Sequence, residues 1–542
     1  MKESYLKTIV ALVALVGTFA AQAAGSHAFV EPSGPLSAPY LWTDVTDWKI
    51  CNDYPNDVIK YRGNISPLGA PGDGKILHVD SNYLTPETPL KIDDGRSVSV
   101  GQAYIGAFAG APYGDDPHVA ALELGKGAVL VTADLNSNFI IGEREGARGA
   151  LILDSGSIVS NNKFRVGSSG FGVVTNNGGY VWTARNNNGY GIYIGYGAIG
   201  AGHYVQNSGY SDFRVTEIGT EGRGTLEFCG GGANVGMPTL GVKSGGRGTY
   251  IVHPGAAVTN GNANVGSAEN SSGTIDLRGG TFLCTGAISV RCTASAYGSI
   301  RGYGMLYKPN ATPGLGEMNG FTMNGQVVAD ADGVEGRFLD LSYARCGNGG
   351  KNNVKTTIVN GMDGTNGWYA VNKGVVTFPL LHVDAAQYVG TFGDNVNNEC
   401  DFVNTVRFSY NQAANKGPWL EAQLYANDSA KIPDGLCGKV LGVFGFRSNA
   451  SVDNRASQLA NFTDFGLRIR YDHRNLKAGD TVALMRYDVT AEKWVRLARV
   501  AHDASSPYIA ADGMTADGAN YDRNLGIFAV VKEPKGLLLI IK

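Results

Sequence analysis

The chain carries little charge and shows no basic cluster. Lysine and arginine number 45 and aspartate and glutamate 48 among 542 residues, so charged residues make up only 17% and the net charge is −3. Nucleic-acid binding needs clustered positive charge that neutralises phosphates, so this composition gives no support for a nucleic-acid partner. We expect partners to be recognised through neutral polar and aromatic surface.

Metal-type cysteine spacing and long hydrophobic runs are also missing. The seven cysteines show no metal-type spacing; in an exported protein they leave one or two disulfides open, and the odd count leaves at least one thiol outside any intrachain disulfide. After residue 23 no stretch reaches the roughly 18 apolar residues that a membrane-spanning helix needs. The sequence therefore predicts no transmembrane segment in the mature chain.

The first 23 residues have the pattern of a secretory signal. Lys2 and Lys7 precede an apolar run from Ile9 to Phe19, and Ala21-Gln22-Ala23 is a small-residue cleavage site. We expect the mature protein to be secreted or held at the cell surface.

Glycine, in contrast, is abundant and periodic. The chain has 77 glycines, about twice average usage. An apolar residue followed by glycine recurs about every 25 residues, at Ile141-Gly142, Val166-Gly167, Ile194-Gly195, Ile218-Gly219, Leu240-Gly241 and Val265-Gly266. A period in the twenties is typical of a solenoid, whose units bury their apolar faces only by stacking.

Within each repeat, two glycines seven residues apart enclose a short segment of period 2. These pairs are Gly149/Gly156, Gly172/Gly179, Gly202/Gly209, Gly224/Gly231, Gly248/Gly255 and Gly273/Gly280. Period 2 predicts strands whose second and fourth residues after the first glycine face inward, namely Leu151/Leu153, Leu226/Phe228, Tyr250/Val252 and Ile275/Leu277. Asn176 and Gln206 occupy the fourth position, so we expect them inside the core with hydrogen-bond partners. The glycines are expected at corners, where positive φ and close coil stacking favour them.

The predicted fold is all-β: a parallel, right-handed β-solenoid followed by a C-terminal antiparallel β-sandwich. The expected bounds are 1–23 for the signal, 24–95 for an N-terminal cap, 96–310 for Gly-rich repeats, 311–395 for irregular final coils and 396–542 for the sandwich. An insertion near Ala111 to His118 is a candidate binding element. Thr481 to Tyr487 and Trp494 to Ala498, joined by a short turn, predict a hairpin in the sandwich.

The coil pattern, apolar-Gly then Gly-x-apolar-x-apolar-x-x-Gly, resembles the β-strand repeats of autotransporter-type passenger domains over roughly residues 100–300. This resemblance implies a scaffold rather than one activity. The order of segments is a Trp-containing opening, Gly-rich coils, the segment Asn366-Gly367-Trp368-Tyr369-Ala370 and a terminal sandwich. This order is similar to that of large exported bacterial proteins of unknown function that use Pro-Glu-Pro C-terminal sorting signals. The tail from Lys532 to Gly536 partly matches that signal, with Lys532 in place of its first proline.

Parallel β-helices also carry polysaccharide lyases and glycoside hydrolases, so an enzyme is one alternative. Such enzymes need clustered carboxylates, or Ca²⁺ with a basic residue, on one outward face. The expected register places Glu227, Asp276 and Arg278 outward as candidate catalytic residues, with Ile251 and His253 on the intervening coil. His203 and His253 have no repeated partner in the pattern, and a solvated face explains the same residues.

Two further candidate sites concern calcium and sugars. Asp330, Asp332 and Glu335 form an acidic turn that would suit Ca²⁺, the one cofactor for which the sequence offers ligands, although the turn lacks the full Asp-x-Asp-x-Asp-Gly loop. Tyr487 and Trp494 are candidates for stacking on a sugar, and hairpin packing explains them equally well.

The leading hypothesis is an exported, non-enzymatic structural or adhesive protein that contacts glycans or other cell-surface polymers. The alternatives are a carbohydrate-active enzyme that uses the lateral face of the solenoid, and a carbohydrate-binding protein that uses the sandwich. Glycan binding and polysaccharide turnover discriminate between the three.

Overall fold

The computed structural model describes most of the chain between residues 27 and 534. Inside that range it does not describe residues 31, 33, 46–47, 52–65, 68–75, 82, 108–118, 133–137, 161–162, 184–190, 292–296, 308–320, 324, 335–336, 342–367, 372, 380–386, 396–401, 411–419, 449–461, 472, 474, 507 and 515–523. The expected signal segment, the insertion near Ala111 to His118 and Glu335 lie outside the described residues. The chain divides into two compact units, unit 1 with Met1–Asn260 and Ser267–Gly273, and unit 2 with Gly261–Gly266 and Thr274–Lys542.

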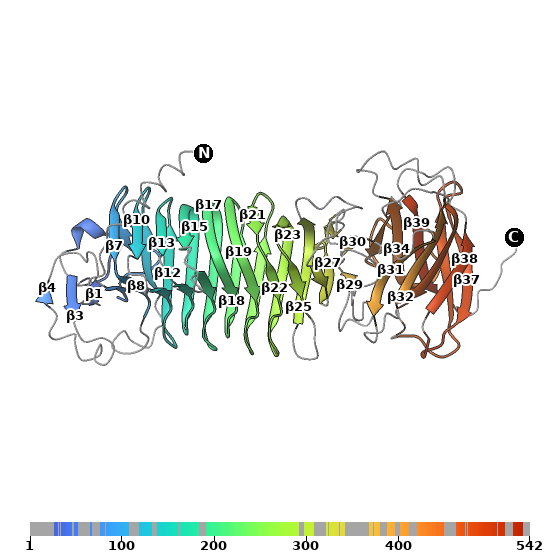
Figure 1. Cartoon of the computed structure of the whole chain (residues 1–542), viewed down its shortest axis with the longest axis horizontal. Helices are drawn as coiled ribbons and strands as arrows, with labels where there is room; N and C mark the ends of the chain where they lie inside the picture. Colours follow the sequence, from blue (N-terminus) through green and yellow to red (C-terminus); the bar gives the residue numbers. More distant parts are fainter. Residues whose placement is uncertain are drawn as a thin grey trace. The chain divides into compact units, whose positions relative to one another are not determined.

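Unit 1 consists of parallel strands in three stacks, where each strand pairs with its equivalents in the neighbouring coils. Figure 1 shows these strands as consecutive rungs from β7 in blue to β19 in green. The first stack contains β5 (Ile76–Val79), β8 (Gln102–Ile105), β11 (Asn138–Ile141), β14 (Lys163–Val166) and β16 (Gly191–Ile194). The second contains β6 (Leu90–Ile92), β9 (Ala120–Leu124), β12 (Arg148–Leu153), β18 (Arg223–Phe228) and β20 (Arg247–Val252). The third contains β7 (Ser97–Val100), β10 (Val129–Thr132), β13 (Ser157–Ser160) and β21 (Ala257–Asn260).

Three long strands pass through more than one stack. They are β15 (Phe171–Thr183), β17 (Ala201–Ile218) and β19 (Gly232–Leu240). The first part of β17 pairs with β18, and its later parts pair with β19 and β16. The predicted short strands of a coil therefore merge here into one continuous strand, and the prediction of a parallel β-solenoid is confirmed.

The repeated glycines answer two different steric needs. Gly219, in an apolar-Gly pair, has φ +67°, a left-handed conformation that residues with a Cβ rarely adopt. Gly224, the first glycine of the inner strand, has no positive φ, but a Cβ there would lie 2.3 Å from the carbonyl oxygen of Ile194 in the preceding coil. The corner therefore needs one glycine for its turn and the strand needs another for close stacking.

The core follows the predicted register. The inward residues Leu151, Leu226, Phe228 and Tyr250 are fully buried in unit 1. Phe228 lies between two aromatic neighbours, with its ring centroid 6.5 Å from that of Tyr204 and 5.7 Å from that of Tyr250. Such rings bury large apolar areas, so this aromatic ladder ties three coils together.

The two polar residues expected inside the core are fully buried and hydrogen-bonded, as predicted. Asn176 accepts from the backbone N–H of Gly179 at 2.7 Å and donates to its carbonyl at 3.2 Å. Gln206 donates to the carbonyls of Gly230 and Gly232 at 3.1 and 2.9 Å. Both side-chain amides form hydrogen bonds with backbone groups where the chain bends into the third stack. These bonds explain why two polar side chains lie in an apolar core.

Buried tyrosines make unit 1 sensitive to alkali. Burial raises the pKa of Tyr104 and of Tyr193 to about 12, and burial also raises the pKa of the core residue Tyr204. Since the unfolded chain ionises near pH 10, this stabilisation is complete below pH 10 and is lost as pH rises from about 10 to about 12. We expect a tyrosinate absorbance titration to show a late class of tyrosines that ionise together with loss of β-sheet circular dichroism. One reversible step near pH 10 for all tyrosines would contradict this expectation.

The N-terminal strands cover the beginning of the stacks. Strand β1 (His27–Val30) pairs antiparallel with β3 (Trp48–Cys51) and parallel with β5, while β3 pairs antiparallel with β4 (Ser66–Pro67). Strand β2 (Tyr40–Leu41) pairs parallel with β6 and leads into the 3₁₀ helix η1 (Trp42–Asp44), in which Trp42 is buried. Parallel pairing thus begins with β1 and β2, within the stretch 24–95 that was expected to form the cap. None of the helices in the described part of the chain has the length and apolar character needed to cross a membrane.

Unit 2 contains further parallel coils. Its parallel strands are β22 (Ala263–Val265), β24 (Ile288–Val290), β25 (Tyr297–Tyr307), β26 (Phe321–Met323), β27 (Gln326–Asp330), β28 (Phe338–Asp340), β29 (Trp368–Val371) and β30 (Val375–Pro379). Strand β23 (Ser272–Cys284) has most of its residues in the same unit. Pairing runs from β22 through β24 to β26, and from β25 to β27 and β28. The coil pattern therefore continues after the glycine repeat in the sequence decays.

Antiparallel pairing takes over in the rest of unit 2. Strand β30 pairs antiparallel with β33 (Leu420–Tyr425), and the sheet continues through β34 (Lys439–Ser448), β39 (Asn524–Lys532), β36 (Thr481–Asp488) and β37 (Lys493–Ala501). A second antiparallel sheet contains β31 (Gln387–Asn395), β32 (Phe402–Tyr410), β35 (Phe462–Arg470) and β38 (Tyr508–Met514). These strands are orange to red in Figure 1. The predicted hairpin is β36–β37, but β31 lies in the stretch where irregular coils were expected, so antiparallel pairing begins before residue 396.

Candidate functional site

The outward face of the second stack is a grid of side chains in register. Counted from the first inner glycine of each coil, odd-numbered positions point outward. Glu227, on β18, pairs in register with Val205 of β17 and Ile251 of β20. Two apolar side chains therefore flank this carboxylate along the stack.

Two histidines hold the Glu227 carboxylate from opposite sides. His203 Nε2 lies 3.1 Å from Glu227 Oε2, and His253 Nε2 lies 2.7 Å from Glu227 Oε1. The side chains are partly exposed, with relative exposures of 37% for His203, 17% for Glu227 and 26% for His253. The three residues thus form a diagonal ladder over three successive coils.

The electrostatics of the ladder favour an ionised glutamate. Burial acts to raise the pKa of Glu227, but the hydrogen bonds with His253 and His203 outweigh burial and leave that pKa below its ordinary value. The carboxylate is therefore charged at neutral pH and sits between two imidazoles.

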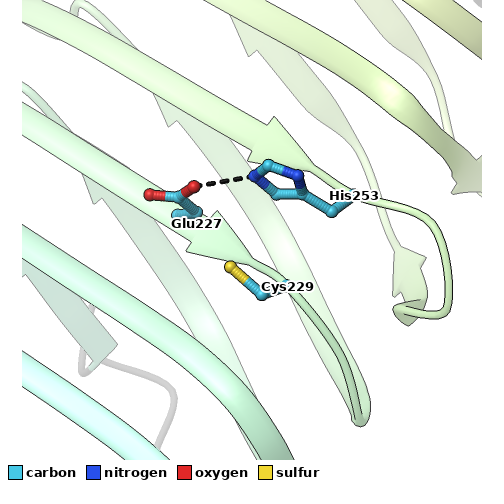
Figure 2. A group of neighbouring side chains, drawn as sticks. All are labelled: Glu227, Cys229 and His253. Carbon is cyan, nitrogen blue, oxygen red and sulfur yellow. Dashed lines mark hydrogen bonds and ion pairs between the residues drawn. The ribbon is translucent and has the colours of Figure 1, made fainter.

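Cys229 adds a sulfur donor to the same place. Cys229 follows Glu227 by two residues and lies just after the end of β18, and Figure 2 shows both side chains near His253, which lies just after the end of β20. One donor atom from each of Glu227, Cys229 and His253 lies within 4.8 Å of the other two. Among the residues that the structure describes, this is the one group of three side chains with metal-ligating spacing.

The sequence pattern placed Glu227 outward correctly but missed its partners. His203, Glu227 and His253 are the first, third and fifth residues after Gly202, Gly224 and Gly248. His253 was expected on the coil between Glu227 and Asp276, and neither histidine has a repeated partner in the pattern. The pattern did not reveal their contacts with Glu227 because these join positions shifted by two residues between neighbouring strands. A search along diagonals of the aligned coils would have found the ladder.

The other two candidate catalytic residues belong to unit 2. The carboxylate of Asp276 is nearly buried and accepts from Nε of Arg278 at 3.2 Å, with Nε of Arg301 at 4.0 Å. Arg301 also contacts Asp330 at 3.3 Å. Asp276 and Arg278 thus belong to an alternating chain of acids and arginines, in which each charge has an opposite partner.

The calcium candidates form a hydrogen-bonded turn. Asp330 Oδ1 accepts from the backbone N–H of Asp332 at 2.9 Å, and Asp332 has φ +54°. The other oxygen of Asp330 is the one that contacts Arg301. Asp330 thus takes part in both the turn and an ion pair.

The sugar-stacking candidates lie on the β36–β37 hairpin. Trp494 and Tyr487 face each other edge to face, with ring centroids 5.4 Å apart. The indole N–H of Trp494 donates to the carbonyl of Pro433 at 3.1 Å, and the ring packs with Ile432 and Leu436 against the core cluster around Val443. These contacts account for the position of Trp494 by packing.

Comparison with known proteins identifies no relative. No family model, no curated protein and no solved structure matches the chain. The similarity to passenger-domain repeats is one of repeat pattern and solenoid fold, and neither establishes membership of that group. Function is therefore inferred from the geometry of the chain itself.

Proposed function

We propose that the protein is an exported structural or adhesive scaffold without catalytic activity, which contacts glycans or other cell-surface polymers. One observation carries the proposal: outward side chains of successive coils bond to one another along the stacks. The contacts that show this in unit 1 are His203–Glu227–His253, Asn207–Asn177 at 2.8 Å, Asn234–Asp212 at 3.1 Å and Lys91–Glu123 at 2.7 Å.

Such contacts suit a structural scaffold. The stability of a solenoid depends on the interface between each repeat and its neighbours, so side-chain bonds between coils strengthen the interfaces on which the fold depends. In these bonds the polar atoms of outward side chains pair with one another, whereas an enzyme would direct such atoms at its substrate. Export is supported by the signal pattern of residues 1–23, and polymer binding by the low charge and the 26 tyrosines.

The proposal predicts an exported protein that binds polymer without degrading it. Cells that produce the full chain would be fractionated, and we expect the protein in the medium or accessible to protease added to intact cells. Incubated with a polysaccharide panel, the purified chain is expected to bind and to release no new reducing ends or unsaturated sugars. Retention in the cytoplasm with an uncleaved N-terminus would overturn the export part.

Matched variants separate the alternatives. Turnover of a polysaccharide that is lost in Glu227→Gln or Asp276→Asn would instead support the carbohydrate-active enzyme. Binding that is lost in Tyr487→Ala, with the thermal unfolding curve unchanged, would place recognition on the antiparallel region. Tyr487→Phe serves as the control because it keeps the ring.

A further inference from the structure

We propose that Glu227, Cys229 and His253 bind a divalent transition metal ion of the zinc type. The three side chains supply one carboxylate oxygen, one imidazole nitrogen and one thiolate sulfur. This mixed set suits Zn²⁺ and Co²⁺, whereas Ca²⁺ and Mg²⁺ prefer oxygen ligands alone. Three protein ligands also leave a fourth position for water or another group.

The backbone brings these donors together at the ends of two paired strands. Glu227 lies on β18, Cys229 is the first residue after β18, and His253 is the first residue after β20. The N–H of His253 bonds to the carbonyl of Phe228 at 2.9 Å, which sets Cys229 and His253 side by side. Glu227 is thus held by a strand, and the other two donors are held by the bond that continues the strand pairing.

Donor spacing and accessibility both fit an ion. The donor atoms lie within 4.8 Å of one another. Tetrahedral Zn²⁺ bonds of about 2.0–2.3 Å space the ligand atoms roughly 3.3–3.8 Å apart. Glu227 Oε1 and His253 Nε2, which are 2.7 Å apart in the metal-free protein, therefore separate when the ion enters between them. Glu227 and His253 are partly exposed, so an ion can enter from solvent. On binding, the ion replaces the Glu227–His253 hydrogen bond: Nε2 of His253 gives up the proton of that bond, and the neutral ring then carries its one N–H on Nδ1. The Cys229 thiol releases its proton to solvent.

His203 acts as a positioning residue. Its Nε2 lies against the second carboxylate oxygen of Glu227 at 3.1 Å, which leaves Oε1 directed at His253. Hydrogen bonds from outside the coordination shell orient metal ligands and typically contribute 10–100-fold to affinity. Loss of His203 is therefore expected to weaken binding by about 10–100-fold without removing a ligand.

A cobalt titration of the full chain tests the site. The protein would be stripped with a chelator under reducing conditions and titrated with Co²⁺, which gives a thiolate-to-cobalt charge-transfer absorption when cysteine coordinates. We expect saturation at one equivalent with this absorption present, and its loss when Zn²⁺ is added in competition. Absence of saturable binding in the native chain would overturn the proposal.

Single substitutions assign the ligands. Cys229→Ser is expected to abolish the charge-transfer absorption, while Cys437→Ser, at an exposed cysteine in unit 2, leaves it intact. His253→Gln and Glu227→Gln are expected to weaken Co²⁺ binding by more than about 100-fold, and His203→Ala by less. Persistence of the absorption in a folded Cys229→Ser chain would refute the assignment. If Cys229→Ser fails to fold, unchanged affinity in both His253→Gln and Glu227→Gln would refute it equally.

Discussion

Substitution of Gly224 by alanine is expected to destabilise unit 1 by more than about 4 kcal/mol, a large effect for the addition of one methyl group. The added Cβ would lie 2.3 Å from the carbonyl oxygen of Ile194 and 2.4 Å from the nitrogen of Gly219. These two atoms bond to each other at 2.7 Å, so neither can move without breaking a contact between coils. Thermal unfolding followed by circular dichroism should show the first transition lowered by roughly 10 °C or more.

Gly255 provides the matched control. It lies in the same solenoid with φ +87°, and an added Cβ would meet nothing within 4 Å. Gly255→Ala therefore carries only the backbone strain of a left-handed residue, roughly 1–2 kcal/mol. Equal destabilisation by the two substitutions would show that the close approach of neighbouring coils at Gly224 costs no more than the backbone strain at Gly255, which would contradict the steric argument.

Substitution of Gln206 by alanine is expected to cost about 2–5 kcal/mol. The fully buried amide satisfies the carbonyls of Gly230 and Gly232 and accepts from the hydroxyl of Ser211 at 2.5 Å. Its removal leaves these groups without that partner and opens a cavity. Thermal unfolding, with limited proteolysis of unit 1, would measure the loss.

The next residue along the chain is the control for Gln206. Asn207 is exposed and bonds to Asn177 on the neighbouring coil. Asn207→Ala is expected to change the stability by about 0.5 kcal/mol or less. If Asn207→Ala proved as damaging as Gln206→Ala, the outward side-chain bonds would contribute as much to coil stacking as the buried amides, which would contradict this expectation.

The inner register of the solenoid could be predicted because two constraints act on the same residues. The glycines mark where each strand begins, and period 2 then decides which side chains face the core. This is why Leu226 and Phe228, and even the polar Asn176 and Gln206, were placed correctly. In the coils that carry the paired glycines, the glycine positions and the period-2 pattern indicate the same inward residues. One alignment of these coils therefore predicts the inward residues of all of them.

Two other features, a strand of the antiparallel region and the ladder around Glu227, could not be predicted from the sequence pattern. Strand β34 holds Leu441, Val443 and Phe444 in a nearly continuous apolar run, because both faces of its sheet are covered, and it therefore lacks the alternation that identifies strands. The His203–Glu227–His253 ladder crosses coils on a diagonal, so no single repeat contains it. Which side chains of neighbouring coils contact each other depends on how their strands pair. The sequence of a single coil does not show this pairing.

The pairing of β30 with β33 bears on how copies of the chain meet in solution. A parallel stack can in principle add further strands at its last edge, and an exposed edge of this kind is a template for uncontrolled polymerisation. The strand after β30 in the sheet runs the opposite way, with Val375 opposite Tyr425 and Pro379 opposite Glu421. A second copy therefore finds no parallel continuation at this edge, and head-to-tail growth of filaments through β30 is blocked by the chain's own reversal of direction.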